Sequence, residues 1–150
     1  MKQRATGFTL IELMIATLMI CILLALASQP LQRYLVQAKR ARAQATLLRL
    51  MQQQEIYYSQ NNRYLAFSSA SSDPDEKRFQ WWSGERAADS AYEIAGAPCP
   101  GETIVQCVRL TATPGTDKVD RNFRDAECAT LWLSSNGRKA ASGPAARCWR

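Results

Sequence analysis

Residues 8–27 read FTLIELMIATLMICILLALA, and this stretch decides the fold. Every residue in it is apolar or small except Thr9, Glu12 and Thr17. At about 1.5 Å of rise per residue, a helix of this length spans about 30 Å, the thickness of the hydrocarbon core of a bilayer. No later stretch is comparable, so the sequence predicts one membrane segment followed by a soluble remainder.

Two ordinary interpretations of this N-terminus compete with a specialised one. Lys2 and Arg4 precede the apolar stretch, as in a secretory signal peptide cut at the Ala-Leu-Ala of 25–27, or in a plain membrane anchor. Glu12 argues against both, because a carboxylate at the centre of a membrane helix costs about 2.5–3.5 kcal/mol on insertion scales, and somewhat less near its end. Glu12 either reaches the membrane surface or meets a positive partner, and a free amine at Phe8 would be such a partner.

The run at 7–13, GFTLIEL, resembles the class III leader and cleavage site of type IV prepilins. This resemblance implies that a membrane prepilin peptidase cuts between Gly7 and Phe8 and methylates the new N-terminal Phe8. It also implies that Glu12 pairs with the N-terminal amine of a neighbouring subunit during filament assembly. Because the cut precedes the apolar stretch, the helix stays in the mature protein.

The helix is predicted to continue beyond the apolar stretch, to about Gln60. Apolar or small residues recur there every three to five positions, which is typical of one face of a helix. They are Leu31, Leu35, Ala38, Ala41, Ala45, Leu48, Met51 and Ile56. The basic run at 39–42 is interpreted as a solvated face, with contacts to acidic lipid or to another subunit as the alternatives. Asn61 and Asn62 are a plausible stop, because Asn tolerates left-handed geometry.

Tyrosines surround the predicted helix end. The string Glu55-x-Tyr57-Tyr58 followed by Asn62-x-Tyr64 resembles a recurrent feature of minor pilins of the PilE and ComP type. We interpret the three rings as a hydrophobic seal where the helix meets a sheet, in preference to a ligand site.

The later part of the chain predicts a small sheet. Residues 92–95, 104–113 and 128–134 alternate as β-strands do, and Ser-Asn-Gly-Arg at 135–138 is a strong turn signal. About three antiparallel strands laid on the end of one helix make an α+β head. The resemblance implies the same architecture, the type IV pilin fold: one long N-terminal helix, hydrophobic and then amphipathic, packed on a small antiparallel β-sheet.

The expected organisation has four parts. They are a leader peptide at 1–7, a transmembrane or filament-core half of the helix at 8–28, an amphipathic half at 29–60, and a periplasmic globular head at 61–150 with the sheet and a C-terminal disulfide loop.

Four cysteines in the C-terminal third predict two disulfides, since an even set in an exported head is typical of a disulfide framework. They are Cys99, Cys107, Cys128 and Cys148. Four cysteines allow three pairings, and the sequence alone does not choose among them. We favour Cys99–Cys107, which would close a hairpin through Pro100-Gly101, and Cys128–Cys148, which resembles the C-terminal disulfide-bounded region of minor pilins. The chain has no Cys-x-x-Cys pair and no His, so a zinc site is disfavoured, and we expect no metal and no cofactor.

The charge balance permits an acidic partner without requiring one. The chain has 19 Lys and Arg against 13 Asp and Glu, a net charge of +6, and removal of Lys2 and Arg4 with the leader leaves 17 against 13, or +4. In the basic segment 118–150, the candidate DNA contacts are Arg138, Lys139 and Arg147, with Trp132 and Trp149 nearby for stacking. A solvated surface with two core Trp residues is the interpretation that we favour over DNA binding.

These features favour a structural subunit over an enzyme, because the chain lacks the His on which most general-base schemes depend. The expected function is that of a minor pilin in assembly and biogenesis of the type IV pilus, and so in twitching motility, adhesion or DNA uptake. The alternatives are a DNA-binding competence pilin and a type II secretion pseudopilin. The pseudopilin interpretation is disfavoured, because the calcium site usual in that class needs a denser cluster of acidic residues than the loose group at 117–127.

The resemblance also implies partners and a location. The partners would be other pilin subunits, the prepilin peptidase, the inner-membrane assembly platform and membrane lipid before assembly, with DNA as a further candidate. The location would be the bacterial inner membrane, with a single pass and a periplasmic head, and then the extracellular pilus.

Overall fold

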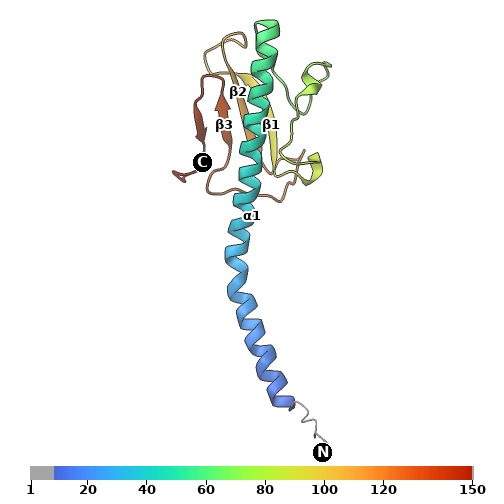
Figure 1. Cartoon of the computed structure of the whole chain (residues 1–150), viewed down its shortest axis with the longest axis vertical. Coiled ribbons are helices and arrows are strands. Elements are labelled where there is room, and N and C mark those ends of the chain that lie inside the picture. The colour runs from blue at the N-terminus through green and yellow to red at the C-terminus, as the bar shows by residue number, and fades with distance from the viewer. Residues whose placement is uncertain (1–8, 150) are drawn as a thin grey trace, which may run out of the picture. The chain divides into compact units, whose positions relative to one another are not determined.

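The structure, a computed structural model, describes residues 9–149, except for the side chains of residues 26–30. The chain divides into two units, Met1–Leu35 and Val36–Arg150. One helix, α1 (Leu10–Asn61), contributes to both units (Figure 1). The predicted long helix is therefore confirmed for the described residues.

The first unit exposes the apolar side chains of α1. All side chains from 10 to 25 are exposed, and Leu10 is 78% exposed. The hydroxyl of Thr17 donates a hydrogen bond to the carbonyl oxygen of Leu13 at 3.0 Å, so this polar group is satisfied within the helix. Among the described residues, we find no helix whose length and apolar character suffice for a membrane crossing. Phe8, where the predicted segment 8–28 starts, lies outside the described residues.

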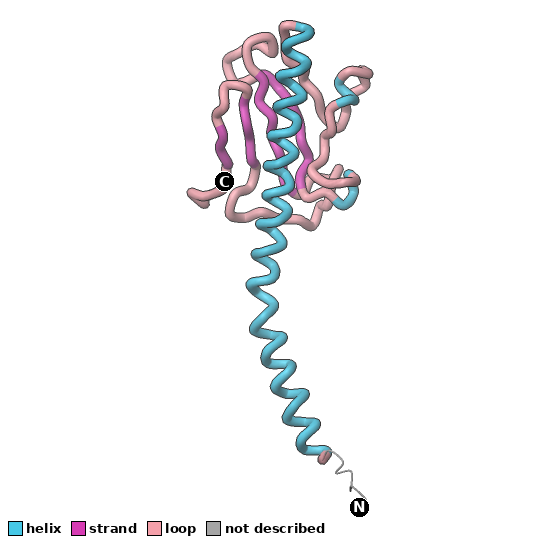
Figure 2. The backbone as a smooth tube through the Cα atoms, viewed as in Figure 1, coloured by secondary structure: helices cyan, strands magenta, loops and turns pink. Residues whose placement is uncertain are grey.

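The second unit contains a four-stranded antiparallel sheet with the strand order β1-β2-β3-β4 (Figure 2). The strands are β1 (Tyr92–Pro98), β2 (Val108–Pro114), β3 (Leu131–Ser134) and β4 (Lys139–Ala141). Two short 3-10 helices, Glu76–Arg78 and Ala87–Asp89, lie between α1 and β1. The predicted α+β architecture is confirmed, with one strand more than the three expected.

Alternation along the strands places one face of the sheet in the core. The buried residues on this face are Tyr92 and Ile94 of β1, Val108, Leu110 and Ala112 of β2, and Leu131 and Leu133 of β3. The strand register sets them against one another, with Ile94 opposite Ala112 and Leu110 opposite Leu133. The α1 residues Ala43, Leu47 and Leu50 complete this core, and their spacing of four and three puts them on one helix face.

The face of α1 that packs on the sheet is not the predicted one. Of the residues that were predicted to form the apolar face and that belong to this unit, Met51 is half-buried. The others are exposed: Ala38, Ala41, Ala45, Leu48 and Ile56. The helix therefore carries two apolar faces, and a period of 3.6 residues cannot tell which of them a sheet will cover.

Two strands begin later than predicted. β2 begins at Val108 rather than at 104, because the N–H of Cys107 donates to the carbonyl oxygen of Thr103 at 3.0 Å in a turn that precedes the strand. β3 begins at Leu131 rather than at 128, because Ala129 has a left-handed backbone with a φ of 50°, which interrupts an extended strand.

The end of α1 agrees with the prediction. The helix ends at Asn61, and Asn62 adopts the left-handed conformation with a φ of 53°. Tyr58 and Tyr64 pack against the core with their ring centroids 4.6 Å apart, which confirms the hydrophobic seal. Buried Gln54 holds the chain after the helix, since its side-chain amide exchanges two hydrogen bonds with the backbone of Leu65, at 2.7 and 2.9 Å.

The two disulfides are Cys99–Cys107 and Cys128–Cys148, the pairs favoured from the sequence. The first closes the connection between β1 and β2. The second joins the C-terminal segment to the residues just before β3, and its Cys148 belongs to the core. This second disulfide thus closes the C-terminal loop, residues 128–148, at its two ends.

Candidate functional site

The first candidate site is the N-terminal assembly motif. Gly7 and Phe8, the predicted cleavage and methylation residues, lie outside the described residues. Thr9 precedes α1, and its hydroxyl accepts a hydrogen bond from the N–H of Glu12 at 3.3 Å, as an N-cap residue does. Glu12 therefore lies in the first turn of α1, where it is exposed and, among the described residues, has no cationic partner.

A buried ion cluster ties α1 to the segment before β3. Arg40 belongs to the basic run predicted to be solvated, but it is only 7% exposed, so that prediction is wrong for this residue. Its Nε and Nη2 donate to the two carboxylate oxygens of Asp125 at 2.8 and 2.6 Å, and Nη2 also donates to Glu127 at 3.0 Å. The hydroxyl of Tyr92 and the N–H of Cys128 also donate to Asp125, at 2.5 and 3.1 Å.

These contacts control the ionisation of the cluster. Burial disfavours the charged form of Asp125, but hydrogen bonds from Arg40, Tyr92 and the N–H of Cys128 outweigh burial, and the pKa of the carboxyl is lowered. The hydrogen bond to Asp125 is the main cause that raises the pKa of Arg40. Burial, followed by the bond to Asp125, raises the pKa of the Tyr92 phenol, which stays a neutral donor. The cluster is therefore a stable ion pair with a structural role.

We expect the second unit to lose stability on acidification through Asp125. A carboxyl whose pKa is lower in the folded state stabilises the fold above its unfolded pKa of about 3.9, and that contribution disappears as the pH falls through the folded value. Thermal unfolding of the full-length protein in detergent, followed by near-UV circular dichroism, should show Tm falling below about pH 5. Asp125→Asn should flatten this fall, and an Asn variant as acid-sensitive as the wild type would contradict the assignment.

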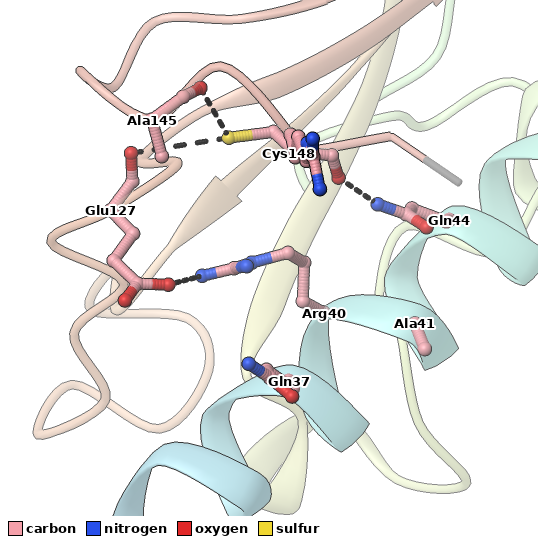
Figure 3. Close-up of a pocket in the computed structure, with 8 residues that line it drawn as sticks. Gln37, Arg40, Ala41, Gln44, Glu127, Ala145 and Cys148 are labelled. Atoms are coloured by element: carbon pink, nitrogen blue, oxygen red, sulfur yellow. Dashed lines mark hydrogen bonds and ion pairs between the residues drawn. The ribbon is translucent and has the colours of Figure 1, made fainter.

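A cavity of about 290 Å³ lies beside the cluster, between α1 and the C-terminal segment (Figure 3). It is lined from α1 by Gln37, Arg40, Ala41 and Gln44, and from the other side by Glu127, Ala145, Arg147 and Cys148. The side-chain amide of Gln44 donates a hydrogen bond to the carbonyl oxygen of Cys148 (Figure 3). Arg147, one of the three predicted DNA contacts, thus lies at this cavity.

The other two predicted DNA contacts have different surroundings. Lys139 lies in β4, and its Nζ is 5.6 Å from the ring centroid of Trp149, whose indole N–H donates to the carbonyl oxygen of Ala140 at 2.8 Å. Arg138 precedes β4 and lines a second cavity, also of about 290 Å³. The three residues therefore do not converge on one cavity, although two of them are neighbours at the start of β4.

Arg109 is a candidate functional residue that the sequence analysis missed. Its neighbours Val108 and Leu110 are buried, so its own side chain lies on the face of the sheet opposite the core. Its guanidinium is 5.8 Å from the ring centroid of Trp132. The alternation at 104–113 already separated Arg109 from the apolar parity, but only the β2–β3 register brings Trp132 to it.

The acidic residues weighed as a calcium site do not all converge, and the two that do, Asp125 and Glu127, share a cation, Arg40. Asp125 pairs with Arg40, while Asp120 lies 3.4 Å from Lys39. Within the part of the chain that the structure describes, one group of side chains has the spacing of metal ligands, Cys99, Glu102 and Cys107. Its two sulfurs are joined in a disulfide, so they do not offer thiolates to a metal.

A capped N-terminal helix with an exposed Glu12, continued into a disulfide-bonded α+β head, defines a pilin-like subunit. In agreement, the prokaryotic N-terminal methylation motif matches residues 2–28. The family described as the type IV minor pilin ComP, DNA uptake sequence receptor, matches residues 31–132, and the chain belongs to this family. It is therefore a structural subunit of the type IV pilus, of the minor pilin class. Its partners are other pilins, and its family consists of pilus subunits rather than enzymes. The predicted resemblance to prepilins is confirmed.

The solved structures that are similar to the chain include two pilins. A type IV pilin from Shewanella oneidensis is 25% identical, with 77% of this chain and 98% of that chain covered and a TM-score of 0.47. The non-core minor pilin PilV from Neisseria meningitidis is 18% identical, with 77% and 94% covered and a TM-score of 0.49. No curated protein is similar enough to count as a match.

Proposed function

We propose that this minor pilin binds DNA on the surface of its head and acts in DNA uptake. Its family is described as a DNA uptake sequence receptor. The observation that carries the proposal is the pairing of cations with aromatic rings: Arg109 lies over Trp132 and Lys139 over Trp149. Basic side chains neutralise DNA phosphates, and aromatic rings beside them offer stacking surfaces. Arg138, next to Lys139, and Arg147 near the C-terminus add further exposed cations.

We propose that the subunit reaches the pilus by the route of a prepilin. The peptidase removes the leader 1–7 by cutting after Gly7 and methylates Phe8, and the segment 8–28 holds the subunit in the inner membrane with the head 61–150 in the periplasm. The assembly platform then moves the subunit from lipid into the filament, where the amphipathic half 29–60 lies between core and head. The exposed carboxylate of Glu12 supports this route, since it is available to a neighbour's N-terminal amine.

Replacing Lys139 and Arg147 together with Gln should weaken DNA binding and reduce its salt dependence. The logarithmic slope of affinity against salt should fall by about one for each phosphate contact that is lost. The measurement is fluorescence anisotropy of a labelled DNA duplex with full-length protein in detergent, over a range of salt concentrations. A matched control is Arg63→Gln with Lys77→Gln, which changes the charge equally at exposed residues before β1. Equal slopes for the two double variants would contradict the proposal.

The same variants separate uptake from filament structure in the source organism. A strain whose chromosomal copy carries Lys139→Gln and Arg147→Gln should retain surface pili but lose natural transformation, with protein secretion unchanged. Loss of pili in this strain would mean that these residues act in the structure of the filament, and the DNA proposal would fail.

A further inference from the structure

The second cavity opens on the face of the sheet opposite the core. Besides the Cys99–Cys107 disulfide region, it is lined by Glu102, Arg109, Trp132, Ser134, Asn136 and Arg138. Its walls thus come from the β1–β2 connection, two central strands and the β3–β4 turn. The turn is held in place by its own hydrogen bonds: the Ser134 hydroxyl donates to Asn136 Oδ1 at 2.6 Å, and the N–H of Arg138 donates to the same oxygen at 3.3 Å. The cavity is therefore largely formed before any ligand arrives.

Arg109 is a cation without an anion in this cavity. Among the described residues, no carboxylate lies within ion-pair distance of its guanidinium, and its Nε is buried without a hydrogen-bond partner. The Trp132 ring, with its centroid 5.8 Å from the guanidinium, is within the distance of a cation–π contact. A partly desolvated cation that lacks a counterion attracts an anion more strongly than a fully hydrated cation does.

Arg138 supplies a second cation to the same space. Its side chain is exposed and, within the described part of the chain, has no ion pair. Glu102 is the one carboxylate among the lining residues, all of which are described, so the lining carries two positive charges against one negative charge. The balance favours an anionic ligand, and Glu102 weakens the attraction without reversing it.

We infer that this cavity binds a phosphate group between the guanidinium groups of Arg109 and Arg138. The planar fork of a guanidinium matches the oxygens of a phosphate in a bidentate arrangement. A volume of about 290 Å³ is near the lower end for small-ligand sites, which suits one phosphate with its attached nucleoside. The assignment of that phosphate to the DNA backbone rests on the proposed function, whereas a free phosphate ester would use the same chemistry.

Two ligands and four variants of the full-length protein in detergent test this inference. Inorganic phosphate is titrated by calorimetry, and a labelled DNA duplex is titrated by anisotropy at several salt concentrations. Arg109→Lys keeps the charge but removes the fork, and Arg138→Gln removes one charge. We expect each of these two substitutions to lower the affinity for both ligands about fivefold or more. Arg138→Gln should also lower the salt slope for the duplex by about one. Glu102→Gln should raise the affinity for both ligands, and the control Lys77→Gln should change neither affinity.

The outcomes separate this inference from the proposed function. If the duplex and inorganic phosphate each bind equally well to Arg109→Lys, Arg138→Gln and the control, the phosphate site is wrong and DNA binds elsewhere. If the binding of inorganic phosphate depends on the two arginines but no duplex binds, the site takes a free phosphate ester and the proposed DNA function is wrong. If neither ligand binds, both fail. If Arg109→Lys does not fold, the Glu102→Gln variant decides instead, because misfolding does not raise an affinity. An unchanged affinity of Glu102→Gln for both ligands would overturn the inference.

Discussion

Replacing Asp125 with Ala should lower the free energy of unfolding of the second unit by about 3–5 kcal/mol, because the substitution leaves Arg40 as a buried cation without its main partner. The Asp125 side chain is fully buried, and its removal also frees the donors of Tyr92 and Cys128. In thermal unfolding of the full-length protein in detergent, we expect Tm to fall by more than about 10 °C.

Glu127→Ala is the matched control for this prediction. Glu127 also pairs with Arg40, at 3.0 Å, but its side chain is 52% exposed, so its loss should cost no more than about 1 kcal/mol. Replacing Arg40 with Met and Asp125 with Leu together should recover part of the lost stability, because no unpaired cation then remains buried. The recovery is incomplete because the donors of Tyr92 and Cys128 still lack an acceptor. If Asp125→Ala lost no more stability than Glu127→Ala, the cluster would not be what holds α1 to the segment before β3.

Replacing Glu12 with Gln should prevent most of the subunit from entering filaments while its membrane level stays unchanged. The variant keeps the size of the side chain, but an amide NH2 replaces one carboxylate oxygen. On the proposed assembly route, it would leave a neighbour's Phe8 amine without a carboxylate in apolar surroundings. An unpaired charge in such a place costs several kcal/mol, and about 1.4 kcal/mol already corresponds to a tenfold change in an equilibrium. We therefore expect the filament-to-membrane ratio to fall at least about tenfold.

The measurement is an immunoblot of sheared filaments against the membrane fraction of the same cells. Thr17→Val is the control, because Thr17 is the other polar residue between 10 and 25 and its hydroxyl is already satisfied by the carbonyl oxygen of Leu13. This control should enter filaments like the wild type. A Gln variant with a wild-type ratio would mean that the charge of Glu12 is not needed for assembly.

Features that depend on nearby residues could be predicted from the sequence. The continuous helix, its stop at Asn61 and Asn62, and the turn at 135–138 are examples of such local features. The strand parity was also correct, although the strand starts were not, since the turn at Thr103 and the left-handed Ala129 interrupt the alternation. The disulfide pairing needed the resemblance to minor pilins in addition to spacing, because spacing alone allows three pairings.

The sequence by itself determined the class of this protein, because the prepilin motif, the apolar stretch and the position of Glu12 all lie within one short segment. Only the tertiary structure decided which face of α1 is buried, why Arg40 is inside, and how Arg109, Trp132 and Arg138 come to line one cavity. Arg40 and Asp125 are 85 positions apart. Contacts of that kind arise from strand register and helix packing, and no local pattern of residue types encodes them.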